Sequence, residues 1–150
     1  KVILKDEAGN TGEVAAEAVK VSADTVRPVL KLTLPKNGVA GEVSSWKRLA
    51  GTATDDKGTG VAGVTVKAIE KRSSGWFFYQ ASTKTWSSAA TKAKAWKRAK
   101  AAVAKVDAKG SWTVRLGGLK KGTLIVKPTA VDLAGNTSKP APHTAVLTAL

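Results

Sequence analysis

The chain has 150 residues, of which 43% are hydrophobic, and it contains no cysteine and no methionine. This size and composition suit one domain with a buried core, and they exclude a disordered chain, a disulfide framework and any thiolate site. The net charge of +14 favours anionic partners, although a solvated lysine-rich surface explains the same excess. No apolar run is long enough to span a membrane, and no signal peptide is present. We interpret the missing methionine as a sign of a piece from inside a longer polypeptide.

The first 26 residues predict a strand, a tight turn and a second strand. The turn string Asp-x-Ala-Gly-Asn-Thr begins at Asp6 and occurs again at Asp132, 126 residues later. In such a turn the Asp accepts backbone hydrogen bonds, the Gly supplies a positive φ and the Asn tolerates the left-handed region. The predicted structural turn residues are therefore Asp6, Gly9, Asn10, Asp132, Gly135 and Asn136.

A segment duplicated at this distance indicates one full module preceded by the end of another. We expect residues 1–26 to be the closing hairpin and linker of a preceding module, and residues 27–150 to be a complete module. Pro28 stiffens the joint between them, because its φ is fixed and it cannot donate to a ladder. The joint therefore predicts a semi-rigid array.

The module itself predicts an all-β fold, because short runs of β-formers alternate with Gly-, Asp- and Pro-containing turns. About seven strands at this spacing are typical of an immunoglobulin-like antiparallel β-sandwich. Pro128 suits an edge or a bulge better than a central strand. The expected strands are Val29–Leu34, Trp46–Thr54, Val61–Glu70, Trp76–Tyr79, Ser111–Leu116, Thr123–Asp132 and Thr144–Ala149.

Residues 89–106 fit two structures. Their Ala and Lys content favours a helix, whereas the alternation at Lys92–Ala95 and the run at Ala101–Val106 favour a loop followed by a strand. We favour the loop and strand and keep the helix as the alternative. Trp86 is expected in a Ser/Thr-rich loop.

Several of these stretches, in their order along the chain, resemble a known family. They are Leu49–Asp55, Gly58–Val64, Gly110–Trp112 and Val131–Thr137. The set resembles the bacterial immunoglobulin-like repeats found in tandem in large secreted and cell-surface proteins, and the similarity covers residues 27–150. It implies an extracellular spacer, stalk or adhesive module without catalysis of its own, whose partners are neighbouring repeats of the same chain or like subunits. The Ala- and Lys-rich segment Lys92–Lys109 departs from the family pattern, as does Pro128.

An enzyme is not expected, because the residues that catalysis needs are missing. His143 is the only histidine, so neither a catalytic triad nor a zinc centre can be assembled. The acidic loop Asp55–Gly60 lacks the spacing of a Ca²⁺ or phosphate loop, and we interpret it as a plain turn. We predict no catalytic residue, no metal ligand and no cofactor.

The candidate binding segment is residues 67–109, where lysines and arginines alternate with aromatic residues. Cations beside stacking rings are used to bind sugars and single-stranded nucleic acid. We expect an anionic cell-wall polymer or acidic polysaccharide, and favour nucleic acid less because the resemblance points outside the cell. Alternatively, the aromatics fill the core and the lysines face water; Trp76, Phe78 and Trp112 are expected in the core and Trp96 at the surface. The candidate polyanion-binding residues are Lys92, Lys94, Trp96, Lys97, Arg98 and Lys100.

Two functions follow as hypotheses. The first is a non-catalytic extracellular structural module, acting as a stalk, a spacer or a filament-forming repeat. The alternative is a binding module for an anionic polymer. Unpaired strand edges of the half-hairpin at residues 1–26 could also complete a neighbouring subunit by strand addition.

Overall fold

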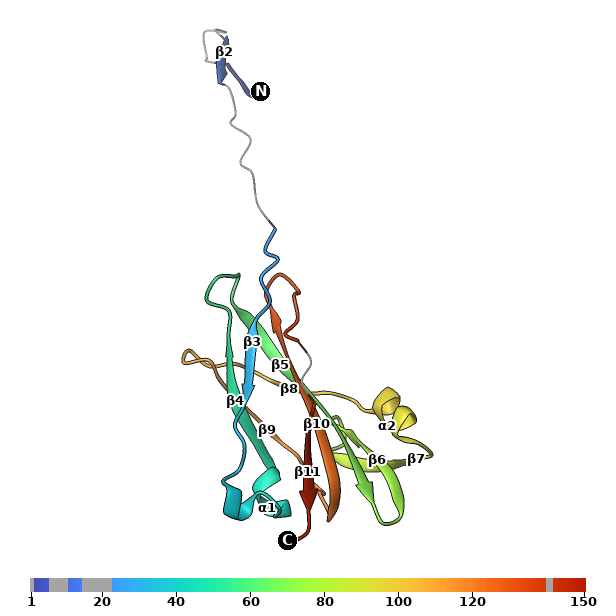
Figure 1. The fold of residues 1–150 in the computed structure, drawn as a ribbon. Coiled ribbons are helices and arrows are strands. Elements are labelled where there is room, and N and C mark those ends of the chain that lie inside the picture. The colour runs from blue at the N-terminus through green and yellow to red at the C-terminus, as the bar shows by residue number, and fades with distance from the viewer. Residues whose placement is uncertain (1, 6–10, 15–22, 140–141) are drawn as a thin grey trace.

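The computed structural model describes residues 2–5, 11–14, 23–139 and 142–150. At the start of the chain, β1 (Val2–Lys5) and β2 (Thr11–Val14) form an antiparallel hairpin. The other strands form two antiparallel sheets that pack face to face (Figure 1). The expected β-sandwich is therefore confirmed.

The smaller sheet has the order β3-β4-β9, and the larger has the order β11-β10-β5-β6-β7, with β8 also paired to β5. This arrangement reproduces the A-B-E and G-F-C strand orders of immunoglobulin domains. The β6–β7 hairpin and β8 are additions to that framework. The strands are β3 (Val29–Leu32), β4 (Arg48–Thr54), β5 (Val61–Arg72), β6 (Gly75–Gln80), β7 (Thr85–Ala89), β8 (Ala102–Ala104), β9 (Ser111–Arg115), β10 (Gly122–Asp132) and β11 (His143–Leu147).

The main core lies between the sheets and follows the two-residue period of the strands. On β5, Val64, Val66 and Ala68 point into it and are fully buried. Trp112 on β9 fills the facing side, as the sequence predicts. Gly51 is required beside it, because a Cβ there would collide with the Lys31 carbonyl oxygen and the Trp112 ring.

The helical segments described by the structure are short: η1 (Asn37–Val39), α1 (Val43–Trp46) and α2 (Lys92–Arg98). The predicted strand start at Trp46 is wrong, because Trp46 ends α1, where its indole N–H donates to the Ala40 carbonyl oxygen at 2.8 Å. Trp86 lies in β7 rather than in a loop. Nowhere in the described ranges does a helix have the length and apolar character needed to cross a membrane.

The α2 helix replaces the loop that the sequence favoured, so that part of the prediction is wrong. Thr91 caps the helix, since its Oγ1 accepts a hydrogen bond from the Lys94 N–H at 3.1 Å. Ala95 and Ala99 lie one turn apart and pack on the outer face of the larger sheet against a second, smaller apolar cluster. Tertiary packing and a good N-cap thus decide in favour of the helix. The strand expected after it is present as β8.

Pro128 occupies the kind of position that its chemistry requires. On one side β10 pairs with β5 along its length, whereas its pairing with β11 runs only from Gly122 to Val126. Pro128 therefore lies in a part of β10 that faces β5 alone, followed by a register shift between Val131 and Asp132. The expected edge character of this segment is confirmed.

Candidate functional site

The turn after β10 is organised by the carboxylate of Asp132, which is only 2% exposed. Its Oδ1 accepts hydrogen bonds from the N–H groups of Ala134 at 2.9 Å and Asn136 at 2.7 Å. Gly135 has a φ of +91°. Asn136 is not left-handed; instead, its side-chain amide donates to Asp132 Oδ2 at 2.8 Å. The asparagine therefore acts through its side chain rather than through its backbone.

In both copies of the turn string, the same two positions pair across the turn. In the first copy this pair ends a four-pair ladder between β1 and β2, and in the second it is an isolated bridge. Val131 lies opposite Thr137 in the second copy, and Lys5 lies opposite Thr11 in the first. These pairs occupy equivalent positions, each residue 126 positions from its counterpart. The turn residues of the first copy, Asp6, Gly9 and Asn10, lie outside the described residues.

The linker before β3 is held on this end of the sandwich by Asp24. Its Oδ1 accepts from the Val26 N–H at 2.8 Å, and its Oδ2 accepts from the N–H and hydroxyl of Thr59 at 2.8 and 2.9 Å. The Asn136 amide also donates to the Asp24 carbonyl oxygen at 2.9 Å. The backbone donors Val26 and Thr59 lower the pKa of Asp24. The linker is thereby fixed to the loops that follow β4 and β10.

Asp24, Asp55 and Asp132 meet at this end, with one carboxylate oxygen of each within 4.8 Å of the others. We call this group the acidic junction. Oxygen donors of this kind suit hard cations such as Ca²⁺, which takes six to eight of them. The sequence treated Asp55 as part of a plain turn and missed this meeting, because the three residues come together only in the fold.

Protein donors already serve most of the acidic junction. Asp55 Oδ2 accepts from the Gly60 N–H at 3.0 Å, and both oxygens of Asp24 and of Asp132 have donors as given above. Among the carboxylate oxygens of the acidic junction, Asp55 Oδ1 is buried and has no hydrogen-bond partner in the described part of the chain. Because N–H and O–H groups satisfy the other oxygens, we assign the junction a structural role: it fastens the linker.

The predicted polyanion-binding residues all lie on α2 or just after it, but the helix divides them between two sides. Lys92 and Trp96, one turn apart, line a cavity of about 290 Å³ together with Lys67 and Lys127. A wider, more open hollow lies on the other flank and is lined by Phe78, Gln80, Lys94, Lys97, Arg98 and Lys100. Lys127 was missed because it lies outside the predicted segment.

The aromatic residues of β6 are not all placed as predicted. Phe78 is buried, but under α2 on the outer face of the larger sheet rather than between the sheets. Trp76, predicted as a core residue, is half-buried and packs against the same outer cluster rather than between the sheets. The Lys71 and Lys92 ammonium groups lie 5.7 and 5.9 Å from its ring centroid. Trp96, expected at the surface, is half-buried. The outer layer therefore combines cations with partly covered rings.

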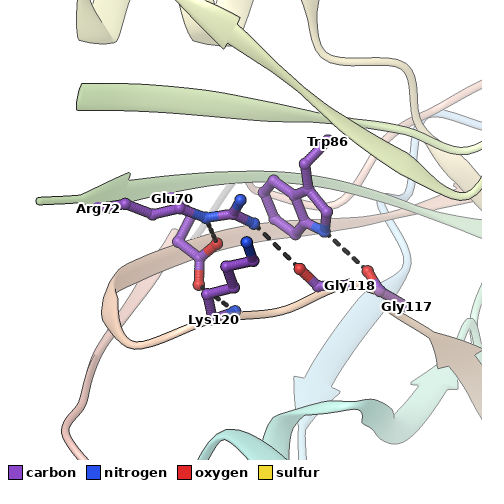
Figure 2. A network of polar contacts seen from close by, with 6 residues as sticks. All are labelled: Glu70, Arg72, Trp86, Gly117, Gly118 and Lys120. Atoms are coloured by element: carbon purple, nitrogen blue, oxygen red, sulfur yellow. Dashed lines mark hydrogen bonds and ion pairs between the residues drawn. The ribbon is translucent and has the colours of Figure 1, made fainter. Parts of the chain in front are cut away.

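A separate polar network joins the C-terminal end of β5 to the loop between β9 and β10 (Figure 2). Glu70 is fully buried and accepts from Arg72 Nε at 2.6 Å and from the Lys120 N–H at 3.0 Å. Arg72 Nη2 donates to the Gly118 carbonyl oxygen at 3.0 Å, and the Trp86 indole donates to the Gly117 carbonyl oxygen at 2.7 Å. These bonds hold the loop against the sheet.

Burial raises the pKa of Glu70, and the hydrogen bond from Arg72 opposes that rise. The Arg72 guanidinium also covers the Phe77 ring at 4.4 Å and the Trp86 ring at 5.4 Å. The hydrogen bonds and ring contacts of Glu70 and Arg72 given above are therefore all made to neighbouring parts of the same chain. We assign it to stability rather than to binding.

His143, the single histidine, packs as an aromatic ring. It stacks on Trp46 with the ring centroids 5.4 Å apart and an interplanar angle of 18°. Its nearest aromatic neighbour is therefore a core residue, and this placement gives it a packing role.

No protein-family model matches the chain, and no curated protein matches it.

Proposed function

We propose that this chain is part of a non-catalytic tandem array in a large bacterial surface or secreted protein, where it acts outside the cell as a stalk, a spacer or a filament-forming repeat. Residues 27–150 form a complete immunoglobulin-like module, and residues 1–26 are the closing hairpin and linker of the preceding one. The observation that carries this proposal is that equivalent residues pair across the turn in both copies, with Lys5 opposite Thr11 and Val131 opposite Thr137. A repeated string closed by an equivalent residue pair supports a repeated structural unit.

The length of the joint supports an array that resists bending. β11 ends at Leu147, and the residue 126 positions earlier in the sequence is Val21, which lies outside the described residues. Asp24 follows three positions later and is already bonded to the loops of the next module. The linker before β3 enters the sandwich at one end, and the C-terminus lies at the opposite end (Figure 1). Modules joined in this way extend end to end.

The sequence on either side of residues 1–150 in the parent polypeptide tests the array directly. We expect further copies of the Asp-x-Ala-Gly-Asn-Thr string at spacings of about 126 residues, each preceded by β-formers. A different kind of domain adjoining residue 1, with no hairpin to complete, would contradict the proposal.

The second candidate function is the binding of an anionic polymer at the surface of α2. The observation that favours it is that cationic side chains line hollows on both flanks of the helix, and neither lining includes an acidic residue. Polyanion affinity, measured at increasing salt, should fall when the basic residues on both flanks become Ser. Affinity that survives this replacement removes the candidate, because any strongly basic protein binds polyanions weakly.

A further inference from the structure

Two lysines lie directly opposite each other on the outer face of the larger sheet. Lys67 on β5 is the antiparallel partner of Lys127 on β10, and the next pair on that face is Ile69 with Ile125. Directly opposed residues have Cβ atoms about 4.5–5.5 Å apart, and like charges at that separation are destabilising. The fold therefore places two lysine side chains of like charge directly opposite each other, at a cost to its own stability.

In the part of the chain that the structure describes, no carboxylate pairs with either lysine. The one ion pair within those ranges joins Glu70 to Arg72, on the face of β5 opposite to Lys67. Lys92, from α2, also lines the cavity, and its ammonium group lies 5.9 Å from the centroid of the neighbouring Trp76 ring. This contrasts with the acidic junction, where protein donors serve nearly every oxygen.

Part of the cavity wall is apolar. Trp96 packs against the small cluster under α2, which holds its ring beside Ile125. Pro142 and Thr144 complete the lining. At about 290 Å³ the cavity is near the lower limit for ligand pockets and accepts one ring-sized unit. We call it the Trp96 pocket.

We propose that the Trp96 pocket binds one acidic sugar unit of an anionic polysaccharide or wall polymer. Lys67, Lys127 and Lys92 bind its carboxylate or phosphate group, and the sugar ring lies against Trp96. Relief of the repulsion between the two opposed lysines adds to the binding free energy. The inference rests on the polymer-binding function proposed above and assigns it a site.

The shape of the pocket favours a sugar over single-stranded nucleic acid. Nucleic acid binds along a groove in which successive bases stack on separate rings. Here the described lining contains one aromatic side chain, Trp96. An isolated aromatic beside clustered ammonium groups suits one charged ring better than a stacked strand.

Calorimetric titration of the whole chain at about 150 mM salt tests the assignment, since this ionic strength screens loose surface attraction. The probes are a glucuronate-containing hexasaccharide, a hexasaccharide whose sugars are linked by phosphodiesters, and a thymidine hexanucleotide. The first two distinguish a carboxylate from a phosphate source. The variant is Lys67→Gln with Lys127→Gln, and the matched control is Lys31→Gln with Lys57→Gln, which removes the same charge from exposed positions away from α2.

We expect the Lys67 and Lys127 variant to bind the preferred acidic probe about tenfold more weakly, and the control to lose less than about threefold. Trp96→Ala should also weaken binding, with a circular dichroism spectrum that confirms a folded sandwich. Equal losses in variant and control, or tighter binding of the hexanucleotide, overturn the Trp96 pocket but leave polymer binding in place. No binding of either acidic probe at millimolar concentration by the unmodified chain overturns both.

Discussion

The acidic junction and the Trp96 pocket each gather three side chains of like charge, but the protein surrounds them differently. At the junction, backbone N–H groups and the Thr59 and Asn136 side chains donate to the carboxylates of Asp24 and Asp132. At the pocket, Lys67 faces Lys127 across two strands, with no acid in the lining. The carboxylates of the acidic junction are hydrogen-bonded by the protein itself, whereas the lysines of the Trp96 pocket are available to an external anion.

This difference separates charges that build the fold from charges that are available for binding. A carboxylate that accepts several N–H hydrogen bonds stabilises the folded state relative to the unfolded chain. An opposed lysine pair destabilises the folded state, because the two like charges repel each other and no acid offsets the repulsion. Net charge alone does not make this distinction, since both groups contribute to it. Removing each group should therefore change stability in opposite directions.

The largest expected effect is at Asp132. Asp132→Ala removes the acceptor of three hydrogen bonds in a buried turn, from Ala134, from the Asn136 backbone and from the Asn136 side chain. We expect a loss of about 2–4 kcal/mol in the free energy of unfolding, measured by urea denaturation. Asp56→Ala, at an exposed position in the neighbouring loop, serves as the control and should change it by less than about 0.5 kcal/mol. Similar values for the two variants would show that the junction does not hold the turn.

The pH dependence of stability gives a second, intermediate test at Asp24. Its pKa is lowered below 3.8 in the folded state, so its contribution is fully present above about pH 4 and is lost as the pH falls through the folded pKa. The melting temperature of the unmodified chain should exceed that of Asp24→Asn at neutral pH. The difference should shrink as the pH falls below about 4. A difference that stays constant over this range would mean that the Asp24 charge plays no part.

The smallest expected effect has the opposite sign. Lys127→Thr removes one member of the opposed lysine pair and places a β-branched residue in a strand. We expect the ligand-free protein to gain about 0.2–1 kcal/mol in stability, measured by thermal denaturation. Lys31→Thr, on exposed β3, controls for strand propensity. Destabilisation at Lys127 greater than at Lys31 would show that the lysine pair is not repulsive.

Local patterns in the sequence predict most of the framework. The alternation at Val64, Val66 and Ala68 identifies β5 and its buried face, and the Asp-x-Ala-Gly-Asn-Thr string identifies the turn after β10. The helix at Lys92–Arg98 was misjudged because alternating Ala and Lys fits two periods, and the decisive contacts of Ala95 and Ala99 lie on distant strands. Local sequence does not contain those contacts.

The candidate sites were harder to predict because each depends on long-range register. Lys67 and Lys127 are 60 residues apart and become neighbours only through the pairing of β5 with β10. The acidic junction likewise draws on the linker and on two loops. A predicted strand order would bring β5 and β10 together, but the exact partner of each lysine also depends on where the ladder begins.

The distance across one joint tests the central claim most directly. Residues 24–149 form one period of 126 residues, so two copies in series recreate the natural joint. The chain has no cysteine, which permits spin labels at Lys121→Cys in the first copy and Lys57→Cys in the second. Pulsed electron spin resonance should give one narrow distance distribution, which broadens when Asp24 of the second copy becomes Ala. A broad distribution in the unmodified pair, or no change with Asp24→Ala, would contradict an array stiffened at the acidic junction.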